Sequence, residues 1–539
     1  QLTDVSCPFF LDTYLMPTSP PVFVTSIYNF VKNNAHQFAL WFSLGCLVVL
    51  LLIKTAFSIS RHPDLSGSER SSTYGIQIVA DRMPLFAEPA EPPYFIAQYS
   101  PAYYYLVGIP YRFLGWDPAD IYRIQLLSRI TSFGLVLMAM AIAFYTARRV
   151  LGVSTSFSLL MVCSLFALLQ QWVLTNSRVD SLLFFSTACF VWAGLRAAKE
   201  PTDWNRYVVW AGVFAICAFF SKQSGIIHNI VIIGFLIYQR RWATLVKLIP
   251  IMAAVFVVLM GLFSGWQPRL FFLNLFGSIA VPIMPGWFYG NTFKYMIPAF
   301  SVMLITSLLI AVSWFVRATD NRKTFLGIST LLFFGFSFGT TFKYGAGIGY
   351  FHEFGYVSHL AIAWFFHDYL NAQQVRRFSY YVFPALVMVG MLYVTSLQIE
   401  NYVKTSFPKL TDEYVQQKHV QQYVAPRISR QDKALVMLGP NARGWMLQQM
   451  LFRNQLAYQD DVVRLLYDAK TLDYSSFGKL VARGEVKYII LPEPGPLYLN
   501  AFDHTFDPGA YTLEKEIDGY LIYRLKTSVA PTPAPPGQS

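Results

Sequence analysis

The sequence predicts a polytopic α-helical membrane protein of about eleven transmembrane helices with a small α/β domain at its carboxyl end. Three observations lead to this fold class. The chain of 539 residues is 55% hydrophobic and only 13% charged, with a mean hydropathy of +0.40, whereas soluble domains carry about 25% charged residues. As far as Leu397, apolar runs alternate with short basic turns. The runs are close to the length of about 20 residues that is needed to cross a bilayer. After Leu397 the composition changes to that of a soluble domain.

Eleven apolar runs are the candidate spans, and together they form a transmembrane module over residues 39–398. Aromatic and polar flanks extend the shorter runs to a full crossing. The runs are Ala39–Phe57, Leu126–Tyr145, Thr155–Leu174, Leu182–Leu195, Tyr207–Phe220, Gly225–Tyr238, Leu248–Phe263, Met296–Phe315, Phe325–Thr340, Gly355–Leu370 and Tyr380–Leu397.

The basic residues between the spans predict the orientation. With eleven spans they fall on one side of the membrane, which is the cytoplasmic side by the positive-inside rule. Residues 1–38 then form a cytoplasmic segment, while the first large loop, 58–115, and the carboxyl-terminal domain lie outside, as in a multi-pass protein of a bacterial inner (plasma) membrane. The basic residues are Arg148, Arg149, Arg196, Lys199, Arg206, Arg240, Arg241, Lys247, Arg317, Arg322, Lys323, Arg376 and Arg377.

Charge and cysteine content exclude several classes of protein. The net charge of +12 resides mainly in these turns, so we do not expect binding to nucleic acid. Of the five cysteines only Cys7 lies outside a span, which excludes a disulfide framework and a CxxC metal pair. Met16 is an alternative start that would leave residues 1–15 outside the native chain, and no cleavable signal peptide is visible.

The carboxyl-terminal segment, residues 399–526, is expected to be an extracytoplasmic α/β domain large enough for its own core. Helix-like stretches occur at Thr411–Tyr423, Asn441–Phe452 and Ser475–Arg483, and short β-type runs at Ala434–Leu438, Val486–Leu491 and Tyr520–Tyr523. The Pro-rich tail, residues 527–539, is expected to be disordered.

Charged residues at the outer ends of the spans are candidates for function, because charge is costly near a membrane. Acids and bases from distant turns are predicted to meet on this outer surface. A site that grips a phosphate and activates a hydroxyl needs such a mixture, with cations on the phosphate and one carboxylate kept free as a base. The outer residues are His62, Asp64, Glu69, Arg70, Asp81, Glu88, Glu91, Arg178, Asp180, Lys222, Gln223, Arg269, Lys294, Lys343, His352 and Glu353.

Short motifs on this surface resemble the GT-C superfamily of polyprenyl-phosphate-sugar-dependent glycosyltransferases, such as protein O-mannosyltransferases and aminoarabinose transferases. The segment SERSSTYGIQIVADRMPLF resembles the acidic start of their first outer loop, and QYSPAYYYLVGIPYRFLG resembles its return to the membrane. TNSRVDSLLFF, AICAFFSKQSGI and FKYGAGIGYFHEFG resemble three later outer segments. The resemblance extends over roughly residues 39–400 through short, degenerate motifs. Many relatives carry a paired Asp-Glu where this chain has Ser68-Glu69, which speaks against a metal-assisted reaction, because one carboxylate is a poor anchor for a divalent ion.

The resemblance implies an inverting transfer of a sugar from a polyprenyl-phosphate donor to a hydroxyl of a lipid, glycan or protein acceptor. Glu69 would be the catalytic base, and Asp180 would orient its partners or bind the sugar. The remaining expected substrate-binding residues are Arg178, Lys222 and Lys343 for the phosphate, Tyr99, Tyr103 and Tyr104 for stacking, and His352. Nucleotide-binding glycine motifs are absent from the sequence. No metal ligands are assigned, and the sequence leaves open whether the reaction uses a divalent metal.

Each residue also has a structural interpretation. Glu69 could be a solvated loop acid, Asp180 an ion-pair partner of Arg178, Lys222 a snorkelling lysine, and the tyrosines an interfacial belt. His352 with His359 gives HExxxxxH, which has the wrong spacing for zinc. The competing functions are a transporter or flippase, a non-catalytic assembly factor, and a polymerase or ligase that uses a diphosphate-linked donor.

Overall fold

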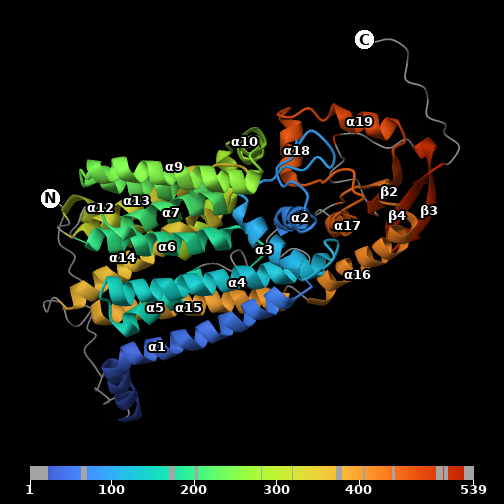
Figure 1. Ribbon diagram of the computed structural model, residues 1–539. Coiled ribbons are helices and arrows are strands. Elements are labelled where there is room, and N and C mark those ends of the chain that lie inside the picture. Colours follow the sequence, from blue (N-terminus) through green and yellow to red (C-terminus); the bar gives the residue numbers. More distant parts are fainter. Residues whose placement is uncertain are drawn as a thin grey trace, which may run out of the picture.

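The protein consists of a long helical bundle with a smaller sheet-containing unit at one end (Figure 1). The structure is a computed structural model and describes residues 22–61, 69–168, 176–200, 204–280, 282–317, 320–371, 379–404, 407–439, 443–492, 502 and 508–526. The expected tail 527–539 and residues 1–15 lie outside these ranges, as do His62 and Asp64.

Each predicted span falls on one helix of the bundle, except that the last residues expected in the third span lie outside the described residues. Within the described ranges, four stretches are long and apolar enough to cross a membrane, namely Gln37–Ile59, Ile121–Val150, Asp180–Lys199 and Trp242–Ser264. Crossing by the other helices stays a prediction. The bundle helices are α1 (Val22–Ile59), α4 (Ile121–Tyr145), α5 (Thr155–Leu168), α6 (Asp180–Lys199), α7 (Arg206–Ser221), α8 (Ile226–Tyr238), α9 (Trp242–Ser264), α12 (Lys294–Arg317), α13 (Asn321–Thr340), α14 (His352–Asn371) and α15 (Ser379–Lys404).

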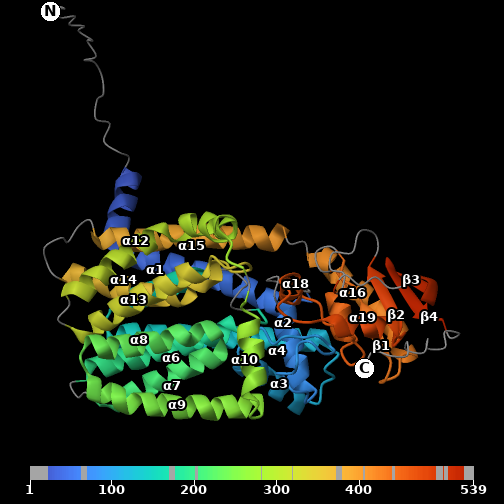
Figure 2. The ribbon, with the colours of Figure 1, turned by 90° about the horizontal axis from the view of Figure 1, so that it is seen from above.

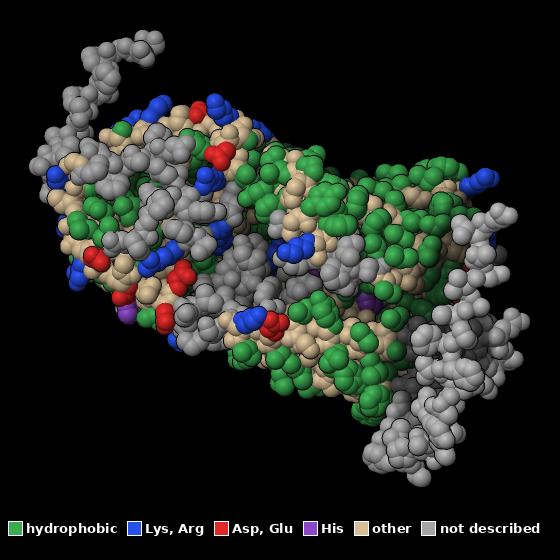
Figure 3. All heavy atoms as spheres, turned by 180° about the vertical axis from the view of Figure 1, so that it is seen from behind, with side chains coloured by type: hydrophobic (Ala, Val, Ile, Leu, Met, Phe, Trp, Pro, Cys, Tyr) green, Lys and Arg blue, Asp and Glu red, His purple; other side chains and the backbone are tan. Residues whose placement is uncertain are grey.

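The outer surface of the bundle is strongly apolar. Trp41 is 72% exposed and Val246 is 70% exposed, and hydrophobic side chains cover large parts of the bundle face in Figure 3. Water-soluble proteins rarely expose apolar patches of this extent, so the surface is suited to lipid.

Basic turns meet at the end of the bundle opposite the sheet. Arg322 Nη1 donates to the Val150 carbonyl at 2.8 Å, and Arg196 Nη2 lies 3.5 Å from the Tyr145 hydroxyl. The clustering at one end agrees with the alternation read from the sequence. The side of the membrane on which this end lies stays a prediction.

The first large loop, which the sequence places outside, contains two helices between the bundle and the sheet unit. They are α2 (Glu69–Ala80) and α3 (Ala102–Phe113). Two further short helices, α10 (Pro268–Gly277) and α11 (Pro285–Phe288), follow α9. Figure 2 shows α10 across the end of the bundle, where Asn274 accepts the Ala97 amide at 2.9 Å and so ties α10 to the first loop.

The carboxyl-terminal unit is an α/β domain with a four-stranded sheet of order β1-β2-β4-β3, in which β1 and β2 are parallel and the other pairs antiparallel. The expected helices and strands are present. Helix α18 and strand β3 were not predicted. Asp518 and Gly519, both at positive φ, turn β3 into β4, and this Asp-Gly pair is a hairpin signal that was available in the sequence. The elements are α16 (Phe407–Val424), β1 (Lys433–Val436), α17 (Trp445–Met450), α18 (Asp461–Asp468), α19 (Ser475–Ala482), β2 (Val486–Pro492), β3 (Tyr511–Ile517) and β4 (Tyr520–Leu525).

The first loop and the α/β domain share their cores. Tyr94 of the loop packs in the core of the domain, and Tyr458 of the domain packs in the core of the bundle. Tyr458 stacks on Tyr74 of α2 with ring centroids 4.2 Å apart. Around this contact Gln449 donates to the Arg70 carbonyl at 2.7 Å. The domain is therefore fastened to α2.

A close backbone contact fixes the turn between α7 and α8. Gly225 lies in a short 3₁₀ turn, Gln223–Gly225, and a Cβ placed there would be 2.1 Å from the Ala218 carbonyl oxygen. Since the obstacle is backbone, it cannot rotate away. This turn begins at Lys222, whose carbonyl accepts the Gly225 amide at 2.8 Å.

We therefore expect Gly225→Ala to lower the free energy of unfolding by about 1–3 kcal/mol or more, the usual cost of overpacking. Gly234→Ala on α8 is the matched control, because its nearest neighbour is a Leu332 methyl at 3.8 Å. Unfolding midpoints in lipid nanodiscs measure both. Equal midpoints for the two variants would contradict this account of the turn.

Candidate functional site

A cavity of about 530 Å³ lies where the bundle, the first loop and the α/β domain meet. Its lining combines cationic side chains with an apolar wall from α7, α8, α10 and α13. The cations are Arg70, Arg178, Lys222 and Lys343, and the apolar wall includes Phe219, Ile226, Phe276 and Phe336. Three of these cations, Arg178, Lys222 and Lys343, were expected here from the sequence.

Two of the cations share one buried carboxylate. Asp180, the first residue of α6, lies 2.8 Å through Oδ1 from Lys222 Nζ and 3.0 Å through Oδ2 from Arg178 Nε. Lys222 Nζ also lies 4.4 Å from the centre of the Tyr350 ring. The ion pair considered for Arg178 and Asp180 is present. Asp180 itself is behind the cavity wall rather than among the lining residues.

The snorkelling interpretation of Lys222 is wrong, because the residue is only 4% exposed. Burial would lower the pKa of Lys222, but the Asp180 carboxylate outweighs burial and raises the pKa above its ordinary value. Lys222 is therefore held as a cation at the cavity wall, with its position set by Asp180.

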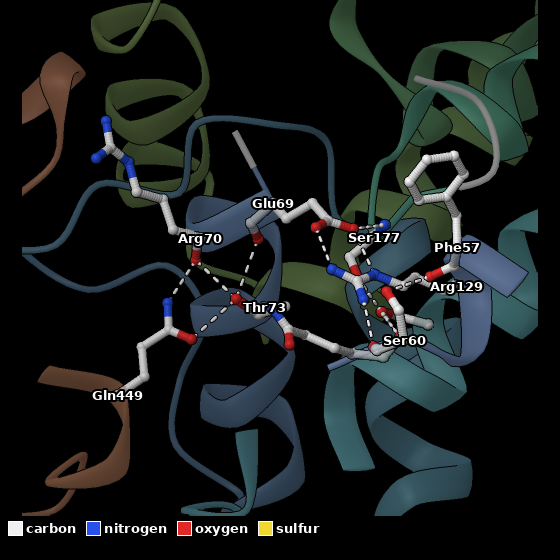
Figure 4. Close-up of polar contacts among 10 residues, drawn as sticks. Phe57, Ser60, Glu69, Arg70, Thr73, Arg129, Ser177 and Gln449 are labelled. Atoms are coloured by element: carbon white, nitrogen blue, oxygen red, sulfur yellow. Dashed lines mark hydrogen bonds and ion pairs between the residues drawn. The ribbon is translucent and has the colours of Figure 1, made fainter. Parts of the chain in front are cut away.

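Glu69 is engaged away from the cavity. Its carboxylate accepts Arg129 Nε at 2.9 Å, Arg129 Nη2 at 2.6 Å and the Ser177 amide at 2.8 Å, and the side chains of Glu69 and Arg129 are fully buried. Figure 4 shows Glu69 directed toward Arg129 while Arg70 points the other way. The expected free carboxylate and the solvated loop acid are both wrong for Glu69. Its catalytic role stays a prediction.

The tyrosines of the first loop divide between cavity and core. Tyr99, which precedes α3, lines the cavity. Tyr103 and Tyr104 were expected to line it as well, and this is wrong, because α3 turns both rings into the core where they are 0% exposed. The Tyr103 hydroxyl donates to the Ser128 carbonyl on α4 at 2.9 Å.

The last two expected residues, Lys343 and His352, lie before α14 and at its first position. Lys343 lines the cavity, and its strand-like segment pairs with the segment around Ile283. No ion pair joins Lys343 to another residue that the structure describes. His352 begins α14 and is 5% exposed, but it is not among the cavity lining, so its substrate contact is not supported by the geometry.

Sequence reasoning missed three residues of this region. Arg129 lies inside a predicted span, so the one signal for it in the sequence was a charged residue within an apolar run. Arg70 was grouped with the outer charges but given no role. Asp460 caps α18, and the pattern of an acid before an amphipathic stretch was a signal that could have found it.

Among the described residues, the structure contains no group of three or more His, Cys, Asp or Glu side chains placed to hold a metal ion. The divalent metal left open by the sequence therefore has no identified ligand set in this part of the chain.

A family model covers the centre of the chain. Residues 125–266 match the model described as dolichyl-phosphate-mannose-protein mannosyltransferase. The matched segment runs from α4 to the end of α9 and contains Arg129, Arg178, Asp180 and Lys222. A search of curated protein sequences found no match.

Solved structures share the fold over most of the chain. ArnT from Cupriavidus metallidurans bound to undecaprenyl phosphate is 14% identical with a TM-score of 0.55, covering 92% of this chain and all (100%) of that chain. The apo oligosaccharyltransferase of Archaeoglobus fulgidus is 14% identical with a TM-score of 0.53, covering 85% of this chain and 70% of that chain. AglB from the same organism, in complex with an inhibitory peptide and a dolichol-phosphate, is 13% identical with a TM-score of 0.51, covering 84% and 69%. The expected GT-C resemblance is thus confirmed at the level of the fold.

The ion pair between Glu69 and Arg129 generates a stability prediction. Glu69→Gln leaves the Arg129 charge buried without its counter-ion, so we expect a loss of about 3–5 kcal/mol in the free energy of unfolding. The double variant Glu69→Gln with Arg129→Gln removes both charges and should lose less than the sum of the two single variants.

Glu88→Gln is the control from the same outer loop. Its partner Arg269 is 76% exposed, so the expected change is about 0–1 kcal/mol. Unfolding midpoints in nanodiscs would compare the four variants. A Glu69→Gln shift no larger than that of Glu88→Gln would contradict the assigned ion pair.

Proposed function

We propose that this chain, which has the fold of the GT-C glycosyltransferases, is a membrane enzyme that moves a sugar from a polyprenyl-phosphate-linked donor to an acceptor hydroxyl. The observation that carries the proposal is the cavity itself. Four cations from four separate segments, Arg70, Arg178, Lys222 and Lys343, converge on one space that also has an apolar wall formed by bundle helices.

The cations suit the phosphate of such a donor. Cation–phosphate hydrogen bonds are among the strong ones in proteins, because both partners are charged. Lys222 and Arg178 are held by Asp180 in advance, so little reorganisation is needed when a phosphate binds. The undecaprenyl phosphate and the dolichol-phosphate named for the similar structures support the assignment of this ligand class.

The apolar wall suits the lipid part of the donor. Phe219 of α7, Ile226 of α8 and Phe336 of α13 line the cavity on the side of the bundle. A prenyl chain placed there would stay in contact with the membrane-embedded helices while its phosphate reached the cations. This arrangement needs no nucleotide-binding motif, in keeping with the sequence.

The chemistry follows from the charge that develops in the reaction. As the bond between the anomeric carbon and the phosphate oxygen breaks, negative charge grows on the departing lipid phosphate. Lys222, Arg178 and Lys343 would stabilise that charge. Attack by the acceptor hydroxyl from the opposite face of the sugar gives inversion at the anomeric carbon.

The predicted orientation puts this reaction on the outer side of a bacterial inner membrane. The α/β domain lies at one end of the bundle (Figure 1), and its residues Asp460, Val462 and Leu465 line the cavity. The basic residues Arg322 and Arg196 make their contacts at the other end. With the basic end in the cytoplasm, the amino-terminal segment is cytoplasmic and the α/β domain is extracytoplasmic. The acceptor, a lipid, glycan or protein, would then enter from outside.

Lys343→Met tests the phosphate assignment without disturbing the Asp180 ion pairs. Loss of one charge-assisted hydrogen bond, about 1.5–3 kcal/mol, should weaken undecaprenyl phosphate binding by about 10- to 100-fold. Arg269→Met is the matched control, because it removes an outer cation that does not line the cavity. Binding is measured by native mass spectrometry in nanodiscs.

Transfer is measured with radiolabelled polyprenyl-phosphate sugars and a membrane extract as the acceptor source. The parent protein should transfer label, and Lys343→Met should transfer less at donor concentrations that saturate the parent. Transport of donor across a vesicle membrane without any sugar transfer would instead support the transporter alternative. Equal binding by Lys343→Met and Arg269→Met would overturn the phosphate assignment.

A further inference from the structure

The α/β domain supplies part of the cavity wall. Asp460, Val462 and Leu465, at the start of α18, line the cavity together with Arg70 and Ser71 of α2. The domain thus reaches the same space as Lys222 and Lys343 of the bundle. A domain that only covered the site from a distance would not place side chains there.

Asp460 is held firmly at this wall. Its Oδ1 accepts the Val463 amide at 2.8 Å as the N-cap of α18, and its Oδ2 accepts the Ser71 hydroxyl at 2.9 Å. The residue is 2% exposed. One bond comes from its own domain and the other from the first loop, so the carboxylate is fixed relative to both.

The carboxylates of Glu69, Asp180 and Asp460 all have polar partners, and they differ in whether they line the cavity. The Glu69 oxygens bind Arg129 and the Ser177 amide, and the Asp180 oxygens bind Lys222 and Arg178. Neither residue lines the cavity. Among the residues that the structure describes, Asp460 is the acid that does.

We propose that Asp460 is the catalytic base of the transfer, an inference that rests on the function proposed above. The acceptor hydroxyl gives its proton to the Asp460 carboxylate, while an oxygen electron pair forms the new bond to the anomeric carbon. The bond from that carbon to the phosphate oxygen breaks, and its electron pair leaves with the polyprenyl phosphate. The acceptor therefore meets the α/β domain at the reacting atom.

Asp460→Asn is the decisive variant, because asparagine caps a helix about as well as aspartate and can hydrogen-bond to Ser71, but it takes up no proton. We expect kcat for sugar transfer to fall by about 100-fold or more, the usual contribution of a general base. The KM for the donor and the affinity for undecaprenyl phosphate should stay within about twofold.

Asp81→Asn is the matched control at the same junction. Asp81 Oδ1 lies 2.8 Å from Arg453 Nη2 of the α/β domain and does not line the cavity. This variant should keep kcat within about twofold of the parent. Unfolding midpoints of both variants should match the parent within the error of the measurement.

The outcomes separate the two proposals. If the parent transfers sugar and Asp460→Asn retains its kcat, Asp460 is not the base, and the proposed function stands. If Asp460→Asn lowers kcat and the unfolding midpoint together while Asp81→Asn does the same, the effect is domain docking and the inference fails. If the parent neither binds undecaprenyl phosphate nor transfers sugar, the proposed function fails and this inference falls with it.

Discussion

The buried ion pair between Glu69 and Arg129 is the constraint on which the cavity end of the molecule depends. Two charges out of contact with water are stable only when their hydrogen bonds are satisfied, and here the Ser177 amide completes the set. The pair fixes three segments at once: α2, α4 and the turn before α6. Since Arg70 follows Glu69 and Arg178 follows Ser177, one interaction positions two cations of the cavity wall.

The same constraint joins the α/β domain to the bundle. Arg129 of α4 holds α2 through Glu69. Other residues of α2 contact the α/β domain through Gln449, Tyr458 and the Ser71–Asp460 hydrogen bond. The loop and the domain then bury side chains in each other's cores. The loop, the bundle end and the α/β domain that line the cavity are thus joined by one connected set of contacts.

The sequence was sufficient for the features that follow from hydropathy and charge. Spans are continuous apolar runs, and Lys222 and Lys343 stand at their ends, so these residues could be placed on one outer surface without coordinates. The ion pair of Glu69 could not be predicted from the sequence, because its partner Arg129 is 60 positions away inside a span. Tyr103 was misplaced because only the formation of α3 decides which way its ring points. Asp460 was missed because α18, which carries it to the cavity, was not recognised.

The central claim is that the converging cations receive a lipid-borne phosphate. A cryo-EM structure of the protein in nanodiscs loaded with undecaprenyl phosphate tests it most directly. The account predicts phosphate density within hydrogen-bonding distance of Lys222, Arg178 or Lys343, with the prenyl chain leading toward Phe219 and Phe336. Phosphate density outside this cavity, with the Lys222, Arg178 and Lys343 side chains facing only solvent or protein, would contradict it.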